Sequence, residues 1–235
     1  MPHFPSIAKL GRVFLDALTS TACLGCGAPS TTLCLACIRR IPRPRQRCIG
    51  CGGAQPDGMT CLTCTETWQV QRLLAAASYR HPLTRSAIKE LKYRLDRSVA
   101  WPLALRMLTA LHTAPRTLHN PLFVPVPLHI RRERSRGFNQ AALLAHTAAD
   151  RGLFSYAEPL KRTRNTASQT KTSGRAGRMD AMTNAFTVTD TKTVSNRHIM
   201  LVDDVCTTGA TLNAAADALM RAGARSITGL VIARA

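Results

Sequence analysis

The sequence predicts an α/β protein in which a parallel sheet is flanked by helices and a small cysteine-rich domain precedes it. From about residue 69 onward, short apolar runs alternate with segments of helical composition, which is the pattern of a parallel sheet covered on both faces. Eight of the nine cysteines lie between residues 23 and 64. A length of 235 residues is enough for one ordinary core and a small satellite, or for two modest domains, and a hydrophobic content of 45% argues against disorder throughout the chain.

The elements of the larger domain follow from the spacing of its apolar residues. Strands are expected at 73–79, 122–126, 199–202 and 226–233. Helices are expected at 82–111, 138–149 and 211–222. In the first of these helices Leu83, Ala87, Leu91 and Leu95 recur with a spacing of four, and Gly223 is placed to end the last one.

The cysteines form four Cys-x-x-Cys pairs, a spacing that turns two sulfurs to one side and suits a tetrahedral metal ion. The predicted ligands are Cys23, Cys26, Cys34, Cys37, Cys48, Cys51, Cys61 and Cys64. Two pairs complete one site, so four pairs predict two structural zinc ions with no position open to water. Metal binding would supply much of the folding free energy of so short a segment.

An internal repeat bears on which pairs share a metal. Segment 23–37 is echoed by 48–64, because in each copy glycine follows the first pair and the second pair begins Cys-Leu. The repeat favours two sequential sites; an interleaved arrangement is the alternative. A disulfide framework is disfavoured because Lys9, Arg12 and Asp16 interrupt the apolar stretch that a secretory signal would need. We therefore expect a cytoplasmic protein, and no apolar run approaches the length of a membrane span.

The charge is strongly unbalanced, with 32 Lys and Arg against 13 Asp and Glu and a net charge of +19. An anionic partner is expected, either nucleic acid or a phosphorylated small molecule. Between the two cysteine repeats lies a stiff basic connector, 39–47, which contains five arginines and two prolines. It either contacts nucleic acid or is a solvated linker.

One segment predicts a binding site. The apolar strand at 199–202 ends in Asp203 and Asp204, and a loop rich in threonine and glycine then leads into a helix. Ligands of open α/β sheets bind at the carboxyl ends of strands, and a helix N-terminus favours a phosphate. The two carboxylates suit a ribose diol or a metal ion. The combination indicates a site for a ribose 5-phosphate.

This segment resembles the 13-residue signature of type I phosphoribosyltransferases, which bind phosphoribosyl pyrophosphate (PRPP). A second stretch, Arg-Gly-Phe-Asn-Gln at 136–140, is similar to a signature of the ComF/GntX proteins. These carry an N-terminal double zinc ribbon and a phosphoribosyltransferase domain, and they are associated with DNA uptake in natural transformation. The resemblance covers nearly all of the chain after residue 20. It implies a double zinc ribbon at 21–68 and a type I phosphoribosyltransferase fold at 69–235. Before them, the apolar stripe of Ile7, Leu10, Phe14 and Leu18 indicates a docking helix at 1–20 rather than a membrane anchor.

The resemblance also implies roles for the matched positions. Asp203 and Asp204 would act as the catalytic pair that holds the ribose hydroxyls, with Mg²⁺ bridging them and the pyrophosphate. The PRPP-binding loop would consist of Thr207, Thr208, Gly209, Ala210 and Thr211, beside the acidic pair. A mobile hood is expected at 163–178. The pyrophosphate and the hood would involve Arg134, Arg136, Gly137, Lys161, Arg162, Arg175 and Arg178.

Two functions are compatible with these residues. The first is an enzyme, a pentosyl-transferring phosphoribosyltransferase that moves the phosphoribosyl group from PRPP to an acceptor with loss of pyrophosphate. The second is a non-catalytic module that holds PRPP or single-stranded DNA and whose zinc ribbons engage DNA or a DNA-uptake helicase.

Overall fold

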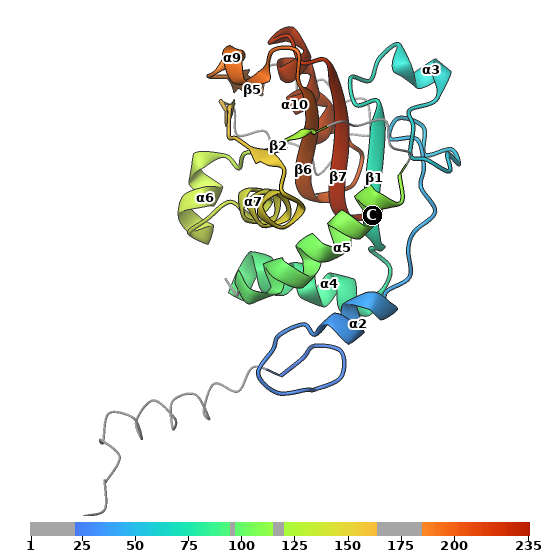
Figure 1. The fold of residues 1–235 in the computed structure, drawn as a ribbon, viewed down its shortest axis with the longest axis vertical. Coiled ribbons are helices and arrows are strands. Elements are labelled where there is room, and N and C mark those ends of the chain that lie inside the picture. The colour runs from blue at the N-terminus through green and yellow to red at the C-terminus, as the bar shows by residue number, and fades with distance from the viewer. Residues whose placement is uncertain (1–21, 95–96, 115–119, 164–184) are drawn as a thin grey trace, which may run out of the picture.

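The computed structural model describes residues 22–94, 97–114, 120–163 and 185–235. The predicted helix at 1–20 and most of the predicted hood lie outside these residues. Within them, five parallel strands form one sheet in the order β1-β7-β6-β2-β3, which confirms the predicted α/β class (Figure 1). The strands are β1 (Arg72–Ser78), β2 (Leu122–Pro125), β3 (Ser155–Tyr156), β6 (His198–Cys206) and β7 (Ser226–Arg234). A separate antiparallel pair is made by β4 (Leu160–Arg162) and β5 (Phe186–Val188).

Helices cover both faces of the sheet. On one face, α5 (Ala100–His112) and α7 (Gln140–Gly152) pack against the alternate strand residues Phe123, Met200 and Val202. On the other face, α10 (Ala210–Arg221) packs against Val124 and Leu201. This alternation buries both faces, as expected for parallel strands whose apolar residues are continuous. The remaining α-helices among the described residues are α2 (Leu35–Arg40), α3 (Leu62–Thr65), α4 (Pro82–Lys89), α6 (Ile130–Arg136) and α9 (Thr191–Val194).

The predicted strands at 73–79, 122–126 and 226–233 agree with β1, β2 and β7 to within one or two residues, but two predictions need correction. The helix expected over 82–111 is divided into α4, a π-helical turn (Glu90–Arg94), a 3₁₀ turn (Arg97–Val99) and α5. The strand expected to end at Val202 continues to Cys206, because its pairing with β7 extends through Asp203↔Val231 and Cys206↔Arg234. The acidic pair therefore lies on the strand itself.

The cysteine-rich region packs along β1, the edge strand of the sheet. The Gln46 amide donates to the carbonyl of Ala75 and accepts from its N–H, both at 3.0 Å. Farther along, the N–H of Leu73 donates to the carbonyl of Gly58 at 2.8 Å. These bonds satisfy backbone groups that an uncovered edge would leave unpaired.

The sheet has a topological switch between β2 and β6. These strands are neighbours, but β2 leads to α7 on one face whereas β6 leads to α10 on the other. Open α/β sheets bind ligands in the crevice outside the carboxyl ends of strands at such a switch. The loops that follow β2 and β6 therefore border the expected binding crevice.

Candidate functional site

The acidic pair lies at the carboxyl end of β6, and the two carboxylates have different surroundings. The Asp203 carboxylate accepts from the backbone N–H of Asp204 at 2.8 Å. The Asp204 carboxylate forms an ion pair with the Nζ of Lys92, also at 2.8 Å. Both acids are only partly exposed. The arrangement places two aspartate carboxyl groups and one lysine amino group together at the switch point.

Lys92 is a site residue that the sequence analysis missed. It belongs to the π-helical turn Glu90–Arg94, which interrupts the helical stretch that the spacing of leucines had predicted. Such turns are frequent at functional sites because they change the direction of a side chain within a helix. No sequence signal marks Lys92, since the leucine spacing runs through it without a break.

Electrostatics at the site bring the pKa of Asp203 close to neutral pH. Burial, followed by the charge of Asp204, raises the pKa of Asp203 to about 7, and Lys92 and Arg162 oppose the rise. Arg162 stands at the end of β4. Burial, followed by the charge of Arg132, lowers the pKa of its guanidinium, and the charge of Asp203 opposes this lowering. The neighbouring Lys161 is exposed. Of this predicted pair, Arg162 is the residue whose charge acts on Asp203.

The loop after β6 makes a tight turn into α10. Gly209 has a φ of +83°, a left-handed conformation that residues with a side chain rarely adopt, and α10 begins at the next residue. Thr207 is exposed, and the Thr208 hydroxyl accepts from the N–H of Ala210 at 3.4 Å. The first turn of α10 thus directs N–H groups and a partial positive charge to the region beside the acidic pair, as a phosphate site requires.

Gly209 also lies against the second cysteine repeat. A Cβ at this position would lie 2.7 Å from Ile49 and 2.8 Å from Trp68, both buried. Next to this contact, Asn213 of α10 accepts from the N–H of Gln69 at 2.7 Å. Gly209, predicted as a phosphate-binding residue, thus also has a packing role.

The loop after β2 lies at the same edge of the sheet. Asn139 anchors it, because the side-chain amide donates to the carbonyl of Val126 at 3.1 Å while its oxygen accepts from the N–H of Ala141 and caps α7. Within this loop Gly137 has a φ of +73° and Arg134 is exposed. Arg136 donates to Gln140 at 3.2 Å. The predicted residues Arg175 and Arg178 lie outside the described part of the chain.

The eight cysteines form two separate groups of four. One contains Cys23, Cys26, Cys34 and Cys37, and the other contains Cys48, Cys51, Cys61 and Cys64. Within each group all sulfurs lie within 4.8 Å of one another, so the sequential pairing is confirmed and the interleaved one is excluded. All eight are free of disulfide bonds.

The sulfur geometry fits zinc. Sulfur–sulfur distances of 3.7 and 3.8 Å join Cys61 to Cys48 and Cys51, and 3.8 Å separates Cys26 from Cys34. A tetrahedron with zinc–sulfur bonds of about 2.3 Å has edges of about 3.8 Å. A catalytic zinc site has three protein ligands and leaves the fourth position to water. Each group here supplies a fourth sulfur instead, so both sites fit a structural ion.

Backbone N–H groups also favour thiolates in both sites. The N–H of Cys34 points at the sulfur of Cys23 at 3.4 Å, and that of Cys61 points at the sulfur of Cys48 at the same distance. Burial would raise the pKa of these two thiols, but N–H donors, led by the two just named, lower the pKa of each to about 6. A thiolate is the form that binds a metal ion.

Among the described residues, no helix is both long and apolar enough to cross a membrane.

Comparison with known proteins agrees with these features. A model of the phosphoribosyl transferase domain matches residues 136–235. The chain is 34% identical over 204 residues to the DNA utilization protein YhgH of Escherichia coli strain K12, covering 83% of this chain and 87% of that protein. It is 31% identical over 214 residues to competence protein F of Haemophilus influenzae, covering 86% and 90%. With competence protein ComFC of Bacillus subtilis it shares 27% identity over 215 residues, covering 88% and 85%.

Proposed function

The chain belongs to the family of competence protein F and DNA utilization protein YhgH, which carries a phosphoribosyltransferase domain, and we propose that it binds PRPP with Mg²⁺ and transfers the phosphoribosyl group. The names of its relatives place them in competence and DNA utilization. Under the same proposal, this chain acts in the uptake or use of DNA, for which its net charge of +19 is favourable.

A single observation carries the proposal. Two carboxylates and the N-terminal turn of α10 meet at the switch between β2 and β6, so that groups suited to a diol and to a phosphate lie side by side. Arg162 and the loop of Arg136 supply positive charge at the same edge of the sheet, where the pyrophosphate would extend. The division into a zinc-ribbon domain at 21–68 and a transferase domain at 69–235 belongs to the same proposal.

Each group has a role that its chemistry allows. The N–H groups and hydroxyls of 207–211 bind the 5-phosphate, and Asp204 accepts from a ribose hydroxyl once Lys92 yields part of its ion pair. Asp203, with its raised pKa, changes its protonation near neutral pH and thereby adjusts the negative charge facing the ribose. A divalent ion, when bound, neutralises pyrophosphate and assists its departure as a leaving group. The protein's own contribution is positioning and preorganised charge.

The test compares two double variants that remove equal charge. In Asp203→Asn/Asp204→Asn the site loses both carboxylates, whereas Asp150→Asn/Asp217→Asn removes two exposed carboxylates elsewhere. PRPP with Mg²⁺ should raise the melting temperature of the wild type and of the second variant by mass action, and should not raise that of the first. An equal rise in both variants would contradict the proposed site.

Turnover is measured separately, as release of pyrophosphate from labelled PRPP in the presence of candidate bases. Acceptor-dependent release is expected. Tight PRPP binding without release for any acceptor would favour the non-catalytic module instead.

A further inference from the structure

A second cationic site lies away from the acidic pair, in a pocket of about 610 Å³ between α5 and the start of the basic connector. Four arginines line it and no acidic residue does: Arg39, Arg40, Arg43 and Arg106. The rest of the lining is largely apolar, including Ile38 and Leu105. None of the lining residues belongs to the proposed PRPP site.

Arg106 is the unusual member of this group because it is buried. Its residue is 8% exposed, and its Nη2 donates to the carbonyl of Ile41 at 2.7 Å. Its Nε is buried and has no hydrogen-bond partner. Buried arginines are ordinarily paired with an acid, since burial of an unpaired charge is costly. Here a neutral carbonyl is the partner of the guanidinium, and the charge is not balanced by a lining carboxylate.

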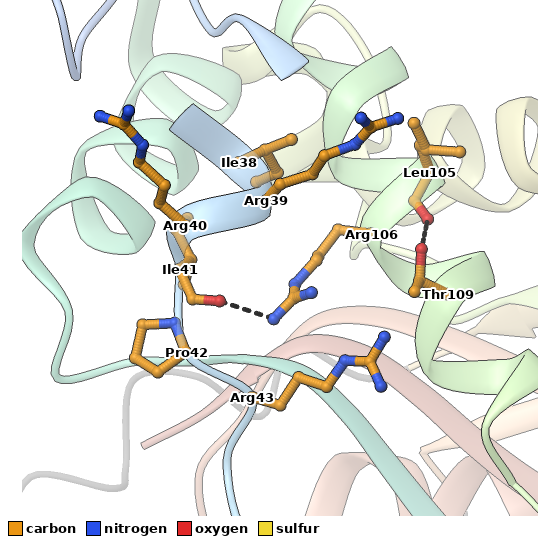
Figure 2. Close-up of a pocket in the computed structure, with 9 residues that line it drawn as sticks. All are labelled: Ile38, Arg39, Arg40, Ile41, Pro42, Arg43, Leu105, Arg106 and Thr109. Atoms are coloured by element: carbon orange, nitrogen blue, oxygen red, sulfur yellow. Dashed lines mark hydrogen bonds between the residues drawn. The ribbon is translucent and has the colours of Figure 1, made fainter. Parts of the chain in front are cut away.

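The neighbouring charge makes this imbalance greater. Burial and then the charge of Arg43 lower the pKa of Arg106, so a second cation lies within its field. Figure 2 shows the Arg106 guanidinium in the middle of the pocket, with the carbonyl of Ile41 on one side and Arg43 below it, while Arg40 points away. Arg43 is exposed and reaches the pocket from the connector. An anion between the two guanidinium groups would relieve their repulsion and satisfy donors that the protein leaves unused.

We propose that this pocket binds a phosphate group, held by Arg106 and Arg43, at the junction of the first cysteine repeat and α5. Arginine suits this role because its planar donors match the oxygens of a phosphate. The apolar walls fit the organic part of the ligand, and the volume lies in the range of small-molecule sites. The phosphate belongs either to the terminus of a nucleotide or strand, or to the backbone of a nucleic acid.

The experiment uses the full chain and three variants. Arg106→Met removes the buried charge, and Arg43→Ala removes the exposed partner without disturbing the core. Arg45→Ala is the matched control, because Arg45 is exposed on the same connector and does not line the pocket. Zinc content and thermal unfolding of each variant establish that it is folded.

Three probes distinguish the sources of the phosphate. They are thymidine 5′-monophosphate, measured by calorimetry, and a 3′-fluorescein ten-residue oligothymidylate with either a 5′-phosphate or a 5′-hydroxyl, measured by anisotropy at low salt. Loss of one charged hydrogen-bonding group should weaken binding about tenfold or more, since each such bond contributes about 1.5–3 kcal/mol. The control should stay within about threefold of the wild type, as expected for one distant charge.

The pattern across the probes gives the answer. If Arg43→Ala and Arg106→Met weaken binding of the monophosphate and of the 5′-phosphorylated strand but not of the 5′-hydroxyl strand, the pocket is a terminal-phosphate site. If the two variants weaken binding of both strands to an equal degree, the pocket is a backbone-phosphate site. If Arg43→Ala and Arg106→Met bind every probe as tightly as Arg45→Ala does, the pocket is not a phosphate site.

Discussion

Replacement of Gly209 by alanine should damage the protein in a way that reveals how the second cysteine repeat supports the phosphate loop. The new Cβ would lie 2.7 Å from Cγ1 of Ile49 and 2.8 Å from Cζ3 of Trp68. Ile49 is 0% and Trp68 6% exposed, so neither side chain can move aside into solvent. The φ of +83° adds backbone strain for any residue that has a Cβ.

The expected loss can be divided into two parts. A left-handed φ costs a residue other than glycine about 1–2 kcal/mol, and overpacking of a filled core costs about 1–3 kcal/mol. Gly209→Ala should therefore lower the free energy of unfolding by about 2–5 kcal/mol. Gly223→Ala, after the other end of α10, is the matched control: its φ is +89°, but a Cβ there would meet Ser195 no closer than 3.4 Å. It should lose only the backbone part.

Urea unfolding followed by circular dichroism measures both losses. A further variant, Gly209→Ala with Ile49→Ala, should lose less than the sum of the two single changes, because one of the two clashing side chains is shortened. If Gly209→Ala and Gly223→Ala cost the same, or the double variant is strictly additive, the contact between the repeat and the loop does not constrain Gly209.

Four further outcomes are expected. Elemental analysis should find two zinc ions per chain, and Cys48→Ser should weaken PRPP binding more than Cys23→Ser does, because the second repeat is the one that contacts Gly209; equal effects would contradict this coupling. Lys92→Met should raise the pKa of Asp203 further in a carboxyl NMR titration, since Lys92 now lowers it, and an unchanged or lower value would show that the ion pair does not influence the site. The pKa of Asp203 is about 7 in the folded protein but 3.8 in the unfolded chain, so between these values the folded state keeps a proton that the unfolded state has lost. The free energy of unfolding should therefore fall as pH rises from about 4 to about 7 and then level off. Asp203→Asn should flatten this slope, and an unaltered slope would show that another group causes it. Binding of single-stranded DNA should weaken as salt rises, with a clearly negative slope of log affinity against log salt, and salt-independent binding would show that the charge of +19 is not what holds it.

Local patterns predicted those parts of the fold that neighbouring residues determine. The apolar runs located β1, β2 and β7. The Cys-x-x-Cys repeat predicted the correct grouping of the sulfurs, because the two Cys-x-x-Cys pairs that form one group are close in sequence. Asp203 and Asp204 were expected to follow the end of their strand, but the strand extends past them through pairing with β7. That extension depends on a neighbouring strand and leaves no mark in the apolar pattern.

The contacts that complete the candidate site could not be predicted because they join distant segments. Lys92 reaches Asp204 from a π-helical turn more than a hundred positions earlier, and nothing in its local sequence distinguishes it from a solvated lysine. In the same way, Gly209 meets Ile49 and Trp68 only after the second repeat has packed beside α10. Arg106 lies in the helix expected at 82–111, but the sequence does not show that its guanidinium is buried. That burial arises because α2 and the connector cover α5.

Amide hydrogen exchange of the wild-type protein, with and without PRPP and Mg²⁺, tests most directly whether the crevice between β2 and β6 is the PRPP site. Exchange should slow at 203–211 and in the loop at 126–139, because the phosphate and pyrophosphate would engage N–H groups there. The amides of α9, which belongs to neither proposed site, should exchange at the same rate with and without the ligand. Saturating PRPP that leaves 203–211 unprotected, or that protects only segments elsewhere, would contradict the proposed site.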